Sequence, residues 1–449
     1  MNINAMTGSI LTGSNIVLIA CRMLFNINES ILRHNEHTAY LALSLMKNQK
    51  LNPKCSERNL VLMSLFHTLG FFSSYVNHQN QFDSEQDYFS SNKATESKYV
   101  FTCHYLENMT PLKKDAHCLA TFTEDYAPLE RQVLYHTEYK SIIYLCARIS
   151  DYLHKNKFND LPEDLNELAP GKLDPEYVRL FKVKNQGDAL IRRIQNGTYL
   201  EKLTDYINQM TFTPEEETQL LKLLVYILDF KSTQTLVHSI NTGSYALSMG
   251  KLLNLSQEEQ KTLFISAILH DIGKTRTPKY VLEARARLSV EQKKLIQGHV
   301  SHSRNILRGL VPDEIVEIVY SHHELCNGQG YPNHLTDEQI PKLAKILTVA
   351  DVASSLMDMR SYKQSYDKDR TLQIMQMETV EQRFNFEYAG TFLNYYDQIK
   401  EELPEVQTLF TVNFADIMDK YNNYIFSEAQ FSTEGKISEE LEELEPAED

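Results

Sequence analysis

Strong helix-start signals, each followed by apolar residues at helical spacing, constrain the fold of this chain more than any other feature. In a capping box, the N-cap side chain and the side chain three positions later each satisfy a backbone N–H group of the other, which favours a helix that begins there. Three such boxes pair Thr213 with Glu216, Ser256 with Glu259, and Ser289 with Gln292. Apolar residues then recur on one helical face. The sequence therefore predicts an all-α fold.

Two of the predicted helices end in residues that can bind metal ions. The helix of the second capping box carries an apolar stripe that continues to His270 and Asp271 at its end. A helix opened by Pro312 ends at His322 and His323. We therefore expect His270 and Asp271 to lie on the buried side of their helix and not in solvent.

Length and charge limit the class of protein. The chain has 449 residues, of which 42% are hydrophobic, and this predicts two or three domains with sizeable cores. Its 60 acidic and 45 basic residues give a net charge of -15, so it is a poor candidate for binding long nucleic acid, where phosphate neutralisation supplies most of the affinity. A small phosphorylated ligand is still compatible, because a few local cations or metal ions can hold it.

The cysteine pattern indicates a reducing compartment. The six cysteines are scattered and form no CxxC pair, which argues against a disulfide framework and favours a cytoplasmic protein. No apolar run approaches the ~20 residues of a membrane span. The apolar stretch 15–25 lacks a basic leader and a cleavage site, so we interpret it as a buried helix.

Short matches between the two halves indicate an internal duplication. Residues 39–53 and 61–70 resemble residues 244–257 and 264–273, and His34 and His238 precede the same ALS triplet by the same distance. In this alignment the N-terminal half has Thr68 in place of Asp271 and Arg148 in place of Asp351. The N-terminal copy has therefore lost the carboxylates that a metal site needs.

The expected domain organisation follows from this alignment. Residues 1–200 are predicted to form a degenerate domain with a regulatory or dimerisation role, and residues 201–426 a catalytic domain. Residues 155–211 have few apolar stripes and are interpreted as a connector, and the acidic residues 427–449 as a disordered tail. We interpret the N-terminal histidines as remnants of a metal site: His34, His67 and His136.

The C-terminal half supplies the donors of a site for two metal ions. Imidazole and carboxylate groups suit divalent iron, manganese or zinc. Two ions about 3.5–4 Å apart need a carboxylate that bridges them and neutral ligands on either side. The candidate donors are His238, His270, Asp271, His299, His322, His323 and Asp351. This combination predicts hydrolytic chemistry on a phosphate ester.

Residues from about 212 to 400 resemble an HD-GYP domain, a branch of the HD phosphohydrolases that opens bacterial cyclic dinucleotides. The matching motifs are HS (238–239), AILHDIGKTRTP (267–278), LSVEQ (288–292), HHE with GQGYP (322–332), IP (340–341) and ADVASSLMDMRSYK (350–363). The resemblance implies an all-helical fold of two HD-type domains. It also implies hydrolysis of one 3′–5′ bond, which gives a linear dinucleotide with a 5′-phosphate.

The resemblance also implies roles for individual residues. One metal ion would be held by His238, His270, Asp271 and Asp351. Asp271 would bridge to a second ion, held also by His299, His322 and His323. Lys274 would contact the scissile phosphate. The remaining substrate contacts would be Gly330, Tyr331 and Pro332 at the lip of the groove, and Arg360 and Lys363 at the phosphates or a base.

Four departures from the family pattern change these expectations. Gln234 and Ser354 stand where some members have carboxylates for a third metal ion, so we expect two ions, iron or manganese. Asn327 replaces the usual aspartate before GQGYP, and Ala284 a usual basic residue, which argues against the usual preference for c-di-GMP. Members with an HD-like N-terminal half include enzymes selective for 3′3′-cGAMP, so we favour that substrate, with c-di-GMP as the second choice.

Two alternatives come from other functional classes. One is a catalytically weak receptor that binds a cyclic dinucleotide and signals through partners. It is disfavoured because a receptor has no need of Lys274 and seven intact candidate ligands. The other is an HD hydrolase for a nucleotide or short RNA, which the GQGYP and RSYK segments argue against. His302 matches no ligand position and is expected at the surface.

Overall fold

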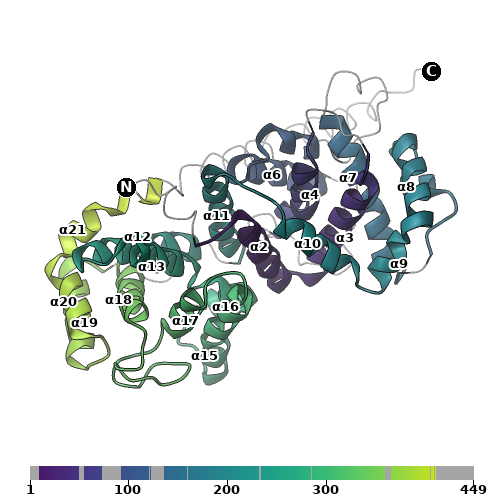
Figure 1. Ribbon diagram of the computed structural model, residues 1–449. Coiled ribbons are helices and arrows are strands. Elements are labelled where there is room, and N and C mark those ends of the chain that lie inside the picture. The colour runs from purple at the N-terminus through teal and green to yellow at the C-terminus, as the bar shows by residue number, and fades with distance from the viewer. Residues whose placement is uncertain are drawn as a thin grey trace, which may run out of the picture.

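The described part of the chain is built from helices (Figure 1). The computed structural model describes residues 10–49, 55–72, 93–120, 122, 136–158, 160–231, 234–284, 286–358, 366–404, 406–408 and 410. Within these ranges the single β-type pairing is an isolated bridge between Asn327 and Thr336. The predicted all-α fold is confirmed. The predicted tail, residues 427–449, lies outside the described residues.

Figure 1 shows an elongated molecule with two lobes. The N-terminal lobe contains α2 (Gly13–Ile27), α3 (Glu29–Met46), α4 (Glu57–Phe66), α5 (Leu69–Phe72), α6 (Lys93–Met109), the 3-10 helix η1 (Lys113–Leu119), α7 (His136–Lys155), η3 (Leu165–Leu168), α8 (Pro175–Asp188), α9 (Leu190–Gln195) and α10 (Tyr199–Asn208). The C-terminal lobe contains α12 (Gln234–Leu252), α13 (Gln257–Leu269), η4 (Ile272–Arg276), α14 (Lys279–Leu282), α15 (Val290–Gln297), α16 (His299–Leu307), α17 (Asp313–Ser321), α18 (Lys342–Met357), α19 (Lys368–Val380), α20 (Phe386–Asn394) and α21 (Tyr396–Glu401). Between them lies α11 (Pro214–Asp229).

Helices begin where the sequence signals indicate. All three capping boxes form, with both reciprocal hydrogen bonds present at the starts of α11, α13 and α15. α17 begins after Pro312 and ends at His322. The apolar stretch 15–25 lies within the buried helix α2, as predicted.

The two lobes share a hydrophobic core. One cluster of buried side chains runs from α2 through α11 to α13, η4 and α17, and a second cluster lies within the C-terminal lobe. Arg22 of α2 also donates two hydrogen bonds across the junction, to the carbonyl oxygens of Ile306 at 2.7 Å and Arg308 at 2.9 Å. A shared core resists relative motion of the lobes, because separating them would expose apolar surface to water.

Residues 155–211 are not the loose connector that the sequence favoured. They form η3, α8, α9 and α10, and the apolar side chains of Phe181, Ile194 and Leu203 are buried. Their apolar stripes are weak because each helix buries few side chains; α8, which has 14 residues, buries only Tyr177, Val178 and Phe181. The expected domain limit at residue 200 falls within α10. The limit itself stays a prediction.

The two lobes repeat one packing arrangement. In the N-terminal lobe α3 packs against both α4 and α7, and in the C-terminal lobe α12 packs against both α13 and α18. The order along the chain is the same in the two sets. Each set has its first two helices at the segments that the sequence alignment matched.

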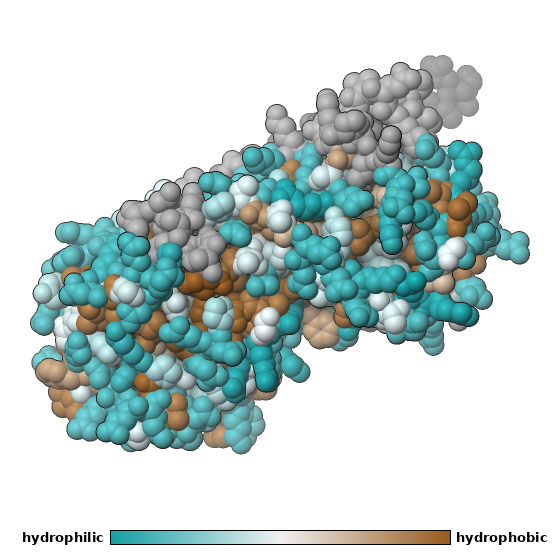
Figure 2. All heavy atoms as spheres, in the orientation of Figure 1, coloured by the Kyte–Doolittle hydropathy of each residue, from teal (hydrophilic) through white to brown (hydrophobic). Residues whose placement is uncertain are grey.

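The visible surface is mostly hydrophilic, with apolar side chains gathered near the junction of the lobes (Figure 2). Among the described helices, none combines the length and the hydropathy that crossing a bilayer would need.

Candidate metal centre

The structure brings together all seven candidate ligands, from five different helical segments. His238 lies one turn into α12, and His270 and Asp271 follow α13. His299 is the first residue of α16, and His322 and His323 follow α17. Asp351 comes from the middle of α18. Six of the seven side chains are buried, and His323 is partly exposed.

Asp271 lies at the centre of this cluster. Its Oδ2 atom is 3.2 Å from Nε2 of His270 and 3.8 Å from Nε2 of His238. Its Oδ1 atom is 3.3 Å from Nε2 of His299. The two oxygens of one carboxylate therefore face two different groups of histidines, which is the arrangement that a bridging ligand requires.

Asp351 completes the other side of the cluster. Its Oδ1 atom is 2.9 Å from Nε2 of His238, and its Oδ2 atom is 3.7 Å from Nδ1 of His323. Nε2 of His322 lies 3.3 Å from Nε2 of His299. Two groups of ligand atoms could each surround an ion: His238, His270 and Asp351 in one, and His299, His322 and His323 in the other.

Backbone carbonyl groups fix the orientation of three histidine rings. The Nδ1 atoms of His270, His299 and His322 each lie 2.6 Å from the carbonyl oxygen three residues earlier. A carbonyl oxygen can only accept, so Nδ1 carries the proton and Nε2 keeps its lone pair for the centre. This is how proteins usually orient histidine ligands.

The charge state of the cluster also suits a cation. Burial lowers the pKa of His299 to about 3 and that of His323 to about 4, so both rings are neutral near pH 7. Burial by itself would raise the pKa of Asp271, but the adjacent imidazole of His270 and the ammonium group of Lys274 hold it well below its ordinary value. Within the described residues, His270 Nε2 and Asp271 Oδ1 are buried without a hydrogen-bond partner. A divalent cation fits this donor set, because it would satisfy these atoms.

A carboxylate that the sequence analysis missed supports His238 from behind. Asp358 accepts a hydrogen bond of 2.7 Å from Ser354, and its Oδ2 atom is 3.5 Å from Nδ1 of His238. Nδ1 of His238 is also 3.0 Å from the Ser354 hydroxyl. Burial lowers the pKa of His238, but the hydrogen bonds with Asp351 and Asp358 outweigh burial and raise it to about 9. The sequence signal that could have indicated Asp358 is its spacing, because it lies two helical turns after Asp351.

The HDIGK segment is shaped by its glycine. A Cβ atom on Gly273 would overlap the carbonyl oxygen of His299 and the backbone nitrogen of Ser303. The Ser303 hydroxyl accepts a hydrogen bond of 2.9 Å from the Gly273 N–H and donates one of 2.8 Å to the carbonyl of His270. Lys274 follows, with its Nζ atom 2.5 Å from Oδ2 of Asp271. The close packing of η4 on α16 thus places the lysine at the centre.

The GYP segment lies against His323. The rings of Tyr331 and His323 have centroids 4.8 Å apart, and the Tyr331–Pro332 peptide bond is cis. A Cβ atom on Gly330 would overlap the backbone of Glu324 and Leu325. The buried carboxylate of Glu324 accepts hydrogen bonds from the backbone N–H groups that follow, at residues 333 and 335. The segment is therefore held firmly at the edge of the metal cluster.

The positions that depart from the family pattern are partly visible. Asn327 donates to the carbonyl of Glu381 and accepts from the N–H of Gln329, each at 3.1 Å, so it stabilises the GQG turn. Arg360, Lys363 and the side chain of Gln234 lie outside the described residues. His302, expected at the surface, is half-buried and lines a pocket at the junction of the lobes.

Comparisons with known proteins identify an HD domain in this part of the chain. An HD domain model matches residues 222–386. The 3′3′-cGAMP-specific phosphodiesterase 1 of Vibrio cholerae is 27% identical over 61% of this chain and 72% of its own length. The cyclic di-GMP phosphodiesterase response regulator RpfG of Xanthomonas campestris is 26% identical over 46% of this chain and 54% of its own length. The chain thus spans only about half of this second relative.

A solved structure supports the fold. The V. cholerae protein V-cGAP3, described as a cyclic GMP-AMP-specific phosphodiesterase, superposes with a TM-score of 0.53 and 16% identity, over 87% of this chain and 98% of that one. Residues 222–386 thus match an HD domain, and the chain is similar in sequence to cyclic-dinucleotide phosphodiesterases, as the sequence motifs indicated.

Proposed function

We propose that this protein is a metal-dependent phosphodiesterase that opens a cyclic dinucleotide. It hydrolyses one 3′–5′ bond and releases a linear dinucleotide with a 5′-phosphate. The observation that carries the proposal is the position of Asp271, whose two oxygens face separate groups of histidines. The names of the homologues supply the substrate class, and 3′3′-cGAMP is favoured over c-di-GMP.

Two divalent ions, iron or manganese, fit the two groups of ligand atoms. One group is His238, His270, Asp271 and Asp351, and the other is His299, His322, His323 and the shared Asp271. Bound ions would supply Lewis acidity for the phosphoryl oxygens and an activated water molecule. The metal content of the purified protein, measured by mass spectrometry, tests the number and the identity of the ions.

The chain's own residues position the substrate. Lys274 is partly exposed at the edge of the cluster, where its ammonium group can contact a phosphate oxygen. Tyr331 stacks on His323, and with Gly330 and Pro332 it would form the lip of the substrate groove that the family motif implies. Arg360 and Lys363 remain candidates for contacts with the phosphates or a base, as the family motif implies.

Location and assembly are part of the proposal. The six cysteines are scattered along the chain and form no CxxC pair, which supports a cytoplasmic enzyme. We infer that the N-terminal lobe serves regulation or homodimer formation. Sedimentation of the full chain tests the second role.

Product analysis tests the proposed activity most directly. Protein loaded with iron or manganese is incubated separately with 3′3′-cGAMP, c-di-GMP and c-di-AMP, and the products are separated by chromatography. We expect 3′3′-cGAMP to be opened fastest. Preferred cleavage of c-di-GMP would contradict the substrate assignment. No cleavage of any of the three by protein with two bound ions would favour a receptor.

A further inference from the structure

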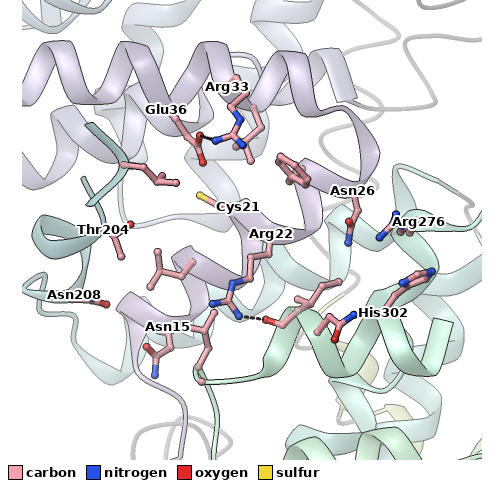
Figure 3. A pocket seen from close by; sticks show the side chains of 18 residues that line it. Asn15, Cys21, Arg22, Asn26, Arg33, Glu36, Thr204, Asn208, Arg276 and His302 are labelled. Atoms are coloured by element: carbon pink, nitrogen blue, oxygen red, sulfur yellow. Dashed lines mark hydrogen bonds and ion pairs between the residues drawn. The ribbon is translucent and has the colours of Figure 1, made fainter. Parts of the chain in front are cut away.

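A pocket lies at the junction of the two lobes, and none of the candidate metal ligands lines it (Figure 3). Its volume of 560 Å³ falls within the roughly 300–1,000 Å³ of small-molecule sites. The N-terminal lobe contributes side chains of α2, α3 and α10, and the C-terminal lobe those of η4 and α16. η4 also carries Lys274, and α16 begins at His299. A ligand here would contact both lobes and the two segments that support the metal cluster.

One end of the pocket is rich in nitrogen donors. Figure 3 shows Asn26 of α2 beside Arg276 of η4, with His302 of α16 close by. Neither the Arg276 guanidinium nor the His302 ring forms an ion pair or a side-chain hydrogen bond with any described residue. Burial lowers the pKa of His302, and the charge of Arg276 lowers it further. This end therefore presents a cation and polar donors with no anion against them.

The other charged groups of the pocket are already paired. Glu36 is its single carboxylate, and it contacts Arg33 at 3.3 Å and accepts a hydrogen bond of 3.1 Å from Tyr199. Arg22 is held by the carbonyl oxygens of Ile306 and Arg308. An incoming anion would therefore find Arg276 available and would meet no free carboxylate.

The opposite end of the pocket is polar but uncharged. Asn15 of α2, with Thr204 and Asn208 of α10, lies at this end in Figure 3. Figure 3 shows Cys21 and Arg22 between the two ends, and apolar side chains such as Leu18 and Leu32 also line the pocket. An amide and a hydroxyl can each donate and accept, which suits the edge of a heterocyclic base. A cation with nitrogen donors at one end, and uncharged donor and acceptor groups at the other, match a ligand with a phosphate at one end and a hydrogen-bonding ring at the other.

We propose that this pocket binds a nucleoside monophosphate, with the phosphate at Arg276 and the base toward Asn208. The site is separate from the proposed catalytic centre. A nucleotide bound in this pocket would contact the N-terminal lobe and η4 at the same time. The N-terminal lobe could thereby sense a small nucleotide. Binding here does not depend on hydrolysis, so it can be measured without any activity.

Calorimetric titration of the full-length, metal-free Asp271→Asn protein with AMP and with GMP tests the proposal. This variant removes the central carboxylate of the metal cluster and leaves the pocket intact. We expect one saturable site per chain for at least one of the two nucleotides. Arg276→Gln should weaken binding at least ~10-fold, the size of a lost charge-assisted contact. Asn26→Asp should weaken it similarly, because it places a carboxylate beside the phosphate.

Matched variants and ligands make the result decisive. Arg276→Lys should bind more tightly than Arg276→Gln, and Arg179→Gln, an exposed arginine of α8 outside the pocket, should bind like the parent. Thermal unfolding confirms that each variant is folded. Affinity unchanged by both pocket variants, or the absence of saturable binding, would overturn the proposal. So would adenosine, guanosine or inorganic phosphate binding as tightly as the nucleotide, because one end of the pocket would then contribute nothing.

Discussion

The two lobes share one helical arrangement but carry different side chains at its matched positions. His34 and His67 of α3 and α4 occupy the places of His238 and His270, and their Nε2 atoms lie 3.2 Å apart. Thr68, in place of Asp271, donates a hydrogen bond of 2.7 Å to Asn35. Arg148, in place of Asp351, donates to the carbonyl of Leu168. The N-terminal cluster thus has imidazoles but no carboxylate in either of these two places.

Hydrogen bonds around the glycines extend the equivalence beyond the sequence match. The N–H of Gly273 donates to the Ser303 hydroxyl, and that of Gly70 donates to the Thr102 hydroxyl at 2.8 Å. A Cβ atom on Gly70 would overlap the carbonyl oxygen of Lys98, as one on Gly273 would overlap that of His299. α6 therefore corresponds to α16, and a buried lysine, Lys98, stands where His299 does. The two lobes therefore keep the same helix packing, although the residues at the metal-donor positions differ.

Substitutions at the two matched central positions, Asp271 and Thr68, should show the largest difference between the lobes. Asp271→Ala should reduce turnover by more than about 100-fold and release metal, because ligand loss exceeds the 10–100-fold cost of changing an outer hydrogen bond. Thr68→Ala, the matched change in the other lobe, should leave turnover and metal content unchanged. Kinetics and metal analysis of both variants check this. An Asp271→Ala protein with two ions and normal turnover would show that the centre is wrongly assigned.

Acidification should next destabilise the N-terminal lobe through its buried histidines. Burial lowers the pKa of His67 and His154 to about 4 and that of His37 to about 3, below the ~6.5 of an unfolded histidine. The unfolded chain therefore binds more protons, and stability is lost as pH falls from 6.5 toward 4, by about 1–2 kcal/mol per histidine at pH 5. Denaturant unfolding at pH 7 and pH 5 measures the loss. His67→Gln should diminish the pH dependence; an unchanged dependence would count against this account.

The glycines should behave alike, because they belong to the shared scaffold. Gly273→Ala and Gly70→Ala should each destabilise the protein by about 1–3 kcal/mol, since the new methyl group overlaps backbone atoms of the neighbouring helix. Thermal or denaturant unfolding of both variants gives the comparison. Gly250→Ala is the control, because its Cβ would make ordinary contacts at 3.4 Å or more. A cost at Gly273 alone would break the proposed equivalence.

The smallest effect is expected from substitution of Asp358, the carboxylate that supports His238. Asp358→Asn should weaken metal binding by about 10-fold, because the carboxylate orients the His238 ring. Lys155, which lies at the corresponding place in α7, pairs with Asp151 at 3.1 Å near the surface, so Lys155→Ala should not change metal affinity. Competition with a metal chelator measures both. Equal affinities for all three proteins would remove the positioning role of Asp358.

Much of the fold could be predicted because its signals are local. A capping box joins residues three positions apart, and an apolar stripe repeats within one helix, so α11, α13, α15 and α17 begin where the pattern indicates. The motifs also indicated seven candidate ligands, which the structure brings together. The helices of residues 155–211 were missed because few of their side chains are buried, as in α8, so their apolar stripes do not stand out from a loop.

The sequence by itself determined the helical class, the family resemblance and the set of candidate donor residues, since these depend on residue types at fixed spacing. Tertiary structure alone decided which atoms face one another. Three features arise where helices distant in sequence pack together. They are the support of His238 by Asp358, the correspondence of Lys98 with His299, and the pocket that Asn26 and Arg276 line at one end. Such contacts depend on the angles and distances between helices, and the burial of apolar surface across the whole core sets these.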